Sequence, residues 1–347
     1  MIEQLEIRNF RGLHRLSMGE STRLNLIAGR NNCGKTSLLE AIFLLSTGGQ
    51  PAFVLNANVV RLGDPGLQSN VRSIRETFWK PLFSRLDTSQ PIEVRAHHRE
   101  VGQISLEVSL QAAETVELAL SDAGTTEAGL HTEQMVLRYQ QGDLTRESSC
   151  RLAPSGVELA QQDAAPPFQA TIILSRNGQI QEDAVSLGAL RTQKRGDLLL
   201  HALREVEPRL QSVEDSSASG FPMIWGDIGL DELVPLPAMG EGISRLARIV
   251  LAIARCPRGI VLVDEIENGF HHSILPKMWR VVSQAAEAFE TQVFATTHSF
   301  ECVQAADCEL EDELALHRLE ADGDGIRCVT YARDDISAAI KHGLEVR

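Results

Sequence analysis

Apolar and polar residues alternate along much of the chain, which is the pattern of strands with one buried and one solvated face. We predict strands of this kind over residues 2–7, 13–24, 91–111, 116–120, 135–139 and 170–174. Residues 38–45 and 198–206 instead carry apolar side chains three and four positions apart, which predicts helices, and Pro208 ends the second one. We predict a loop over residues 121–132, a linker over residues 213–220 and one or two short strands over residues 222–237. The chain therefore belongs to the α/β class.

A phosphate-binding loop lies between a predicted strand and a predicted helix. Residues Gly29-Arg30-Asn31-Asn32-Cys33-Gly34-Lys35-Thr36-Ser37 fit G-x-x-x-x-G-K-[ST], with the apolar segment 24–28 before them. The two glycines let the loop N–H groups point inward, and the helix N-terminus adds partial positive charge. Lys35 would then reach the β- and γ-phosphates, and the Thr36 hydroxyl would take one Mg²⁺ position. A chance match in a glycine turn is the alternative, and the flanking strand and helix disfavour it.

Length, charge and cysteine content narrow the class of protein. The 347 residues are 43% hydrophobic and 23% charged, an ordinary globular balance. The net charge of −14 argues against a surface coated with non-specific nucleic-acid contacts, although a local basic groove stays open. Arg8, Arg11 and Arg15 near the first turn could touch a nucleotide base or DNA phosphates, but simple solvation on an edge hairpin is the favoured alternative. Six scattered cysteines without a C-x-x-C pair disfavour a zinc site or a disulfide framework. Without a visible signal peptide or membrane-spanning run, we expect a cytoplasmic protein.

Two apolar strands in the last third end in chemically active side chains. Residues 259–263 run directly into Asp264 and Glu265, and residues 292–297 run into His298. An acid after a doubly buried strand is the usual partner of a phosphate loop, so Asp264 would hold Mg²⁺ and Glu265 would deprotonate an attacking water. His298 would lie over the same crevice and sense the γ-phosphate, a capping or core role being the alternative.

A glycine-rich turn opens a third predicted helix. Gly240 and Glu241 precede apolar residues at helical spacing from Leu246 to Ile253. The free N–H groups and the dipole of such a helix N-terminus attract phosphate, although the same pattern alone would be an ordinary helix start.

Together these motifs resemble the ABC-type ATPase heads of the RecF/SMC class, most closely the OLD-like small bacterial AAA-family proteins. The resemblance covers nearly the whole chain through NFRG at 9–12, GRNNCGKTSLLEAI, MGEGISR, IVLVDEIENGFHH and VFATTHS. It implies a P-loop NTPase fold with a mixed central sheet, an antiparallel β subdomain and a helical lobe. By position, 29–37 is Walker A, Gly240-Glu241 the signature loop, Asp264-Glu265 Walker B, 267–272 the D-loop and His298 the switch histidine. We expect one ATPase domain over 1–347, with its Walker A lobe at 1–180, a helical segment and linker at 181–235, and the remaining motifs at 236–347.

The resemblance implies an ATP- and Mg²⁺-dependent switch that forms a homodimer around nucleotide. From the resemblance we expect the switch to serve DNA repair or anti-phage defence, with a separate effector such as a nuclease, because about fifty residues after His298 are too few for a TOPRIM domain. The signature serine is missing, since Ala238-Met239-Gly240 stands in place of Ser-Gly-Gly, and Gln50 is a weak candidate for the Q-loop. A regulatory ATP-binding module with negligible turnover therefore remains an alternative. A small-molecule P-loop kinase is disfavoured by the residues after Glu265 and by the extra signature loop.

Overall fold

The computed structural model describes most of the chain. The described residues are 1–52, 54, 75–112, 133–153, 156–160, 166–174, 180–217, 220–310, 313–323, 325–331, 335, 336 and 338. The predicted strand at 116–120 and the predicted loop at 121–132 lie outside them.

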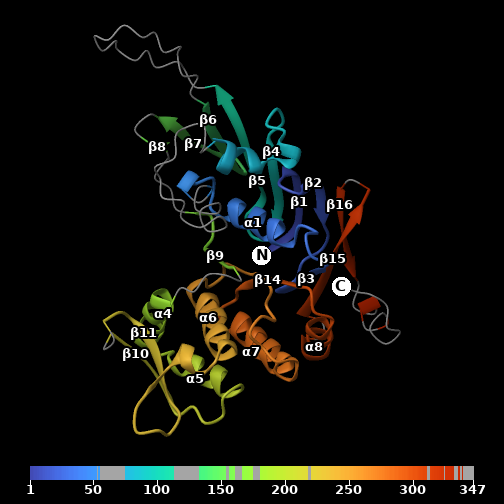
Figure 1. Ribbon diagram of the computed structural model, residues 1–347. Helices are drawn as coiled ribbons and strands as arrows, with labels where there is room; N and C mark the ends of the chain where they lie inside the picture. The colour runs from blue at the N-terminus through green and yellow to red at the C-terminus, as the bar shows by residue number, and fades with distance from the viewer. Residues whose placement is uncertain are drawn as a thin grey trace, which may run out of the picture.

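A six-stranded mixed sheet runs through the middle of the molecule (Figure 1). Its order is β16-β15-β3-β14-β13-β9, and all neighbours are parallel except the antiparallel pair β15 and β16. The strands are β3 (Leu24–Gly29), β9 (Ala170–Ile173), β13 (Ile260–Val263), β14 (Gln292–Thr297), β15 (Leu314–Asp322) and β16 (Gly325–Tyr331). Because β3, β13 and β14 are parallel, their carboxyl ends meet at one edge of the sheet.

A seven-stranded antiparallel sheet lies above it in Figure 1, with α1 (Lys35–Ser46) between the two. Its order is β2-β1-β4-β5-β6-β7-β8. The strands are β1 (Ile2–Phe10), β2 (Leu13–Met18), β4 (Ile92–His98), β5 (Gly102–Ala112), β6 (Glu133–Gln141), β7 (Leu144–Ala153) and β8 (Gly156–Ala160). Short helical turns cover Arg75–Trp79, Lys80–Leu82 and Ser84–Leu86.

Helices cover the other face of the six-stranded sheet and form a side lobe. The covering helices are α6 (Glu241–Arg255), α7 (Leu275–Ala288) and α8 (Phe300–Leu310). The side lobe contains α4 (Ile180–Thr192), α5 (Asp197–Arg204) and a small sheet of β10 (Ser212–Ser216), β11 (Met223–Asp227) and β12 (Val234–Pro235). Short turns at Leu236–Met239 and His272–Ile274 precede α6 and α7.

The central sheet is buried on both faces, and β13 shows how its side chains divide. Val261 and Val263 pack in the core formed with α6, α7 and α8, whereas Ile260 and Leu262 pack in the core formed with α1 and the seven-stranded sheet. All four are at most 1% exposed, and burying each such side chain stabilises the fold by about 1.5–3 kcal/mol. A continuous apolar run is what a doubly covered parallel strand requires.

The predicted mixed sheet, antiparallel subdomain and helical lobe are confirmed. The predicted linker at 213–220 is wrong in its first half, because β10 pairs there with β11. Among the described residues, no helix is long and apolar enough to cross a membrane.

Candidate ATPase site

The phosphate loop connects the end of β3 to the first turn of α1. Gly29 is the last residue of β3, residues Asn31 to Gly34 form the turn, and Lys35 to Ser37 begin the helix. Lys35 is 8% exposed, and its ammonium donates to the carbonyl oxygens of Gly29 at 2.6 Å and Arg30 at 2.8 Å. A positive charge is therefore fixed inside the loop, at the N-terminal end of the helix dipole.

Gly34 is the N-cap of α1 and needs a left-handed backbone, with φ of 86°. A Cβ there would lie 2.8 Å from Cδ2 of Leu13, so the β1–β2 hairpin packs directly against the loop. Cys33 is half-buried in the same turn, and burial raises the pKa of its thiol.

The two halves of the predicted metal site meet although they are 228 positions apart in the sequence. The Thr36 hydroxyl lies 3.1 and 3.2 Å from the two carboxylate oxygens of Asp264, directly after β13. The Thr296 hydroxyl of β14 donates to the same carboxylate at 2.7 Å. A hydroxyl and a carboxylate are hard oxygen ligands suited to Mg²⁺, so the side chains present fit this ion.

Glu265 follows Asp264 in a turn with a positive φ of 49°. Its N–H donates to the Thr296 hydroxyl at 2.8 Å, and its Oε2 accepts from Nδ2 of Asn268 at 2.7 Å. The side chain is 36% exposed, so its carboxylate borders solvent next to the Thr36–Asp264 pair.

His298 follows β14 and faces two carboxylates. Its Nδ1 lies 3.2 Å from Oε1 of Glu267 and 4.0 Å from Oε1 of Glu265. The same Glu267 oxygen accepts the backbone N–H of His298 at 2.9 Å, and Glu267 is buried. Glu267 thus holds His298 at two points, the backbone N–H and Nδ1 of the imidazole.

The predicted signature loop contacts the D-loop rather than the phosphate loop of its own chain. Gly240 caps α6 with φ of 129°, and Glu241 begins the helix. A Cβ at Gly269 would lie 2.8 Å from Cγ of Glu241, and a Cβ at Gly242 would lie 2.7 Å from the Gly269 carbonyl oxygen. The structure therefore brings Walker A, Walker B and the switch histidine together, but not Gly240 and Glu241 with Lys35.

Two side chains of this site, Arg245 and Thr296, had no predicted role, and Glu267 and Asn268 were predicted only as part of the D-loop. Arg245 is 5% exposed and donates through Nη2 to the carbonyl oxygens of Asp264 at 2.6 Å and Glu265 at 2.8 Å. A sequence signal for it exists, because Arg245 falls one helical turn before Ile249 on the buried face of α6. A charge in an apolar stripe needs a specific buried partner.

Other predicted contacts lie away from the site. Arg11 pairs with Glu40 of α1 at 2.9 Å and is 8% exposed, so the expectation of a solvated or nucleic-acid-contacting arginine is wrong for it. Arg8 forms exposed ion pairs with Glu6 and Glu93. Gln50 follows the C-terminal end of α1, whereas the phosphate loop lies at its N-terminal end, roughly 18 Å away for a helix of this length.

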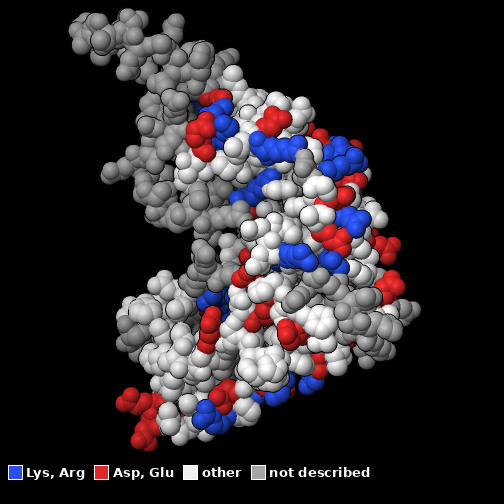
Figure 2. Space-filling model, turned by 45° about the vertical axis from the view of Figure 1, so that its right-hand side comes forward, with Lys and Arg blue, Asp and Glu red and all other residues white. Residues whose placement is uncertain are grey.

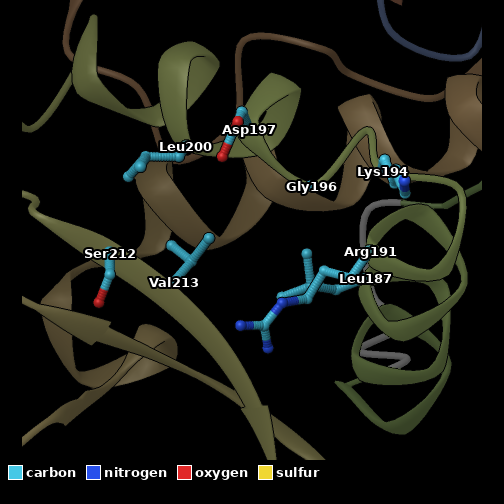
Figure 3. A pocket seen from close by; sticks show the side chains of 8 residues that line it. All are labelled: Leu187, Arg191, Lys194, Gly196, Asp197, Leu200, Ser212 and Val213. Atoms are coloured by element: carbon cyan, nitrogen blue, oxygen red, sulfur yellow. The ribbon is translucent and has the colours of Figure 1, made fainter.

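Outside the site, positively and negatively charged side chains lie next to one another on the surface. Figure 2 shows Lys and Arg interspersed with Asp and Glu over the face in view. A cavity of about 360 Å³ opens in the side lobe between α4, α5 and β10 (Figure 3). Its Arg191 pairs with Asp215 at 2.9 Å, so this guanidinium is already engaged.

Comparison with known proteins agrees with these motifs. Residues 1–99 match the family model described as "AAA ATPase domain", and residues 163–302 match "AAA domain, putative AbiEii toxin, Type IV TA system". An ATP/GTP phosphatase of Helicobacter pylori is 22% identical over 92% of this chain and 90% of its own length.

Two further relatives match over short segments. The DNA double-strand break repair Rad50 ATPase of Archaeoglobus fulgidus is 39% identical over 19% of this chain and 7% of its own length. The DNA replication and repair protein RecF of Nitrosococcus oceani is 49% identical over 14% of this chain and 13% of its own length. A crystal structure of an SMC head bound to the C-winged helix domain of ScpA superposes with a TM-score of 0.51 at 13% identity. It covers 98% of this chain and 99% of that one, which shows the shared fold.

Proposed function

Because the chain is an ABC-type ATPase head of the RecF/SMC class, we propose that it is a molecular switch that closes as a homodimer around ATP and opens after hydrolysis. The observation that carries this proposal is the contact between Thr36 and Asp264. It places the phosphate loop, the metal-binding acid and the adjacent Glu265 at one edge of the sheet.

Each side chain has a defined part in this reaction. Lys35 and the N–H groups at the start of α1 bind the β- and γ-phosphates, and Thr36 and Asp264 hold Mg²⁺, which offsets phosphate charge. Glu265 accepts a proton from water as the water oxygen bonds to the γ-phosphorus and the bond to ADP breaks. His298, held in place by Glu267, senses the γ-phosphate through a hydrogen bond.

The signature loop completes the site of the second subunit. Glu241 and Gly242 lie against Gly269 of the predicted D-loop of their own chain, and the first N–H groups of α6 have no partner within the helix. We propose that these groups bind the γ-phosphate held by a partner copy, in place of the missing serine. The three lobes then act as one ATPase domain, in the cytoplasm, with a separately encoded effector.

The names of the relatives support the choice of biological setting. RecF and Rad50 are DNA repair proteins, which supports a role in DNA repair, and the second family description names a toxin of a toxin–antitoxin system, which supports a role with a separate partner. Alanine at position 238, in the place of the signature serine, favours as second candidate a binding module that dimerises with negligible turnover.

The Glu265→Gln variant distinguishes the ATP-hydrolysing switch from the binding module. The amide keeps the shape but cannot accept the proton, so turnover should fall by about 10²–10⁴ while ATP still binds. Phosphate release from ATP and GTP, and dimer mass by light scattering, are measured for wild type, Glu265→Gln and the exposed control Glu232→Gln. A switch gives turnover in wild type and a trapped ATP-bound dimer in Glu265→Gln. Negligible release by the wild type, with dimerisation intact, would establish the binding module instead.

A further inference from the structure

Glu265, the proposed base, occupies a strained backbone conformation. Its φ of 49° lies in the left-handed region, which residues other than glycine seldom adopt. Such strain persists only where the surroundings fix it, and it concentrates at functional sites. The contacts that hold this turn therefore decide where the Glu265 carboxylate points.

Two of these contacts come from neighbouring elements. The Thr296 hydroxyl of β14 accepts the N–H of Glu265 at 2.8 Å, and Nη2 of Arg245 donates to its carbonyl oxygen at 2.8 Å. The same nitrogen of Arg245 donates to the preceding carbonyl, that of Asp264, at 2.6 Å. One guanidinium nitrogen thus bridges the backbone of the metal-binding acid and that of the base.

The partners of Arg245 are unusual for a buried cation. Within the described part of the chain, its hydrogen bonds go to main-chain oxygens and its Nε has no hydrogen-bond partner. Burial, followed by the nearby Arg248, lowers the pKa of the guanidinium, while Glu267, Asp264 and Glu241 act in the opposite direction. A buried charge that stabilised only the fold would gain more from a carboxylate, so the geometry favours a role in fixing this turn.

Arg245 also links the turn to the signature loop. It lies in the second turn of α6, close to Gly240, and a Cβ built at Gly240 meets no described atom within 4 Å. The start of α6 is therefore open to a partner, while Arg245, one turn later, donates to the main-chain oxygens of Asp264 and Glu265. A small shift of α6 would move the carbonyls of Asp264 and Glu265.

We propose that Arg245 is a positioning residue through which the signature helix of each subunit aligns the Glu265 of that same subunit for hydrolysis. This inference rests on the proposed ATP-driven dimer. Arg245 touches neither nucleotide nor water in this scheme, and it acts through the backbone of Glu265.

The test compares Arg245→Met and Arg245→Lys with Arg248→Met. Arg248 lies one turn further along α6 and pairs with Asp183 at 3.2 Å, and its side chain is only 14% exposed, so its loss controls for weakened helix packing. Arg245→Met should bind ATP within about twofold of wild type and dimerise on ATP. Its kcat should fall by about 10²-fold, because a misplaced catalytic group costs that much. Arg245→Lys, which keeps one charged donor, should recover part of kcat, and Arg248→Met should keep it.

Mixed dimers separate action within a subunit from action across the dimer. In such a dimer, one subunit carries Arg245→Met and the other carries Glu265→Gln. If Arg245 serves the Glu265 of its own subunit, each of the two ATP sites has one defect, and the mixed dimer should stay inactive. Recovered turnover would mean that Arg245 serves the partner's nucleotide, and it would overturn the inference. If Arg245→Met fails to fold, ATP affinity and kcat are compared between Arg245→Lys and wild type instead.

Failures of the two proposals are distinguishable. A wild-type protein that does not dimerise on ATP would refute the proposed switch, whatever the variants do. A wild type that dimerises and hydrolyses ATP, with Arg245→Met matching its kcat, would refute the role of Arg245 alone.

Discussion

Lys35 shows how a single side chain prepares the phosphate loop. Its ammonium donates to two loop carbonyls and is almost fully buried, so the charge is fixed where the β- and γ-phosphates would bind. Charge-assisted contacts of this kind contribute about 1.5–3 kcal/mol each. ATP phosphates would replace the carbonyls as acceptors with little movement of the lysine.

We therefore expect Lys35→Ala to weaken ATP binding by roughly 10- to 150-fold, the equivalent of that energy, and to abolish hydrolysis. Fluorescent-nucleotide titration and phosphate release measure the two effects, with the surface variant Lys80→Ala as control. Near wild-type hydrolysis by Lys35→Ala would show that the site lies elsewhere.

His317 makes a prediction about stability and pH. It is fully buried in β15, its Nδ1 lies 3.0 Å from the Thr330 hydroxyl, and burial lowers its pKa to about 4. Between about pH 6.5 and pH 4, the unfolded chain binds a proton on His317 and the folded chain does not. The contribution of neutral His317 to the free energy of unfolding is therefore complete above about pH 6.5 and is lost as the pH falls toward 4. The slope is on the order of 1.4 kcal/mol per pH unit for this group.

Chemical unfolding at pH 7.5 and 5.0 tests this slope. The loss of unfolding free energy on acidification should be smaller in His317→Gln than in wild type, whatever the cost of the substitution at pH 7.5. The exposed His14→Gln serves as control. An equal loss in His317→Gln and wild type would contradict the assignment.

Between elements, the Arg11–Glu40 ion pair ties the β1–β2 hairpin to α1. The two side chains are 8% and 3% exposed, and their 2.9 Å contact lies beneath the helix that carries Lys35 and Thr36. Breaking one partner of a buried pair leaves an uncompensated charge, which costs about 3–5 kcal/mol. Replacing both partners by apolar side chains costs far less.

Arg11→Met should therefore destabilise the protein by about 3–5 kcal/mol, and Arg11→Met combined with Glu40→Met should restore most of the loss. Urea unfolding measures both, and Arg8→Met, at an exposed pair, should change stability by less than about 1 kcal/mol. A double variant no more stable than Arg11→Met would show that the pair is not the source of the effect.

The elements that could be predicted from sequence are those whose signal is local. The phosphate loop combines an apolar strand, a glycine turn and an apolar helix within 23 residues, so both its conformation and its chemistry were predictable. By contrast, β10 has the sequence SVEDS with one buried apolar side chain, Val213, and it becomes a strand because β11 pairs with it. For Arg245, its place on the apolar face of α6 signalled a buried charge, but the sequence did not identify its partners, because they are main-chain oxygens.

For the whole molecule, the arrangement of the motifs matters more than any single one. Three parallel strands bring Walker A, Walker B and His298 to one sheet edge, while the start of α6, at Glu241 and Gly242, lies against Gly269. In the proposed switch, the site is complete only when a second copy supplies the α6 N-terminus. Dimerisation and hydrolysis should then depend on the same loop.

Gly240→Asp tests this dependence, with Gly240→Ala as the matched control. Both variants place a Cβ on a backbone with φ of 129°, so they share the same strain, and neither Cβ meets a described atom within 4 Å. The aspartate adds a negative charge next to the partner's γ-phosphate, where the α6 dipole would contribute only about 0.3–2 kcal/mol of attraction. We expect Gly240→Asp to keep monomer ATP affinity, because Walker A is elsewhere, and to lose ATP-dependent dimerisation and hydrolysis together. Gly240→Ala should retain more of both. ATP affinity and dimer mass are measured on the same samples, and normal ATP-dependent dimerisation of Gly240→Asp would mean that this loop does not face a partner's nucleotide.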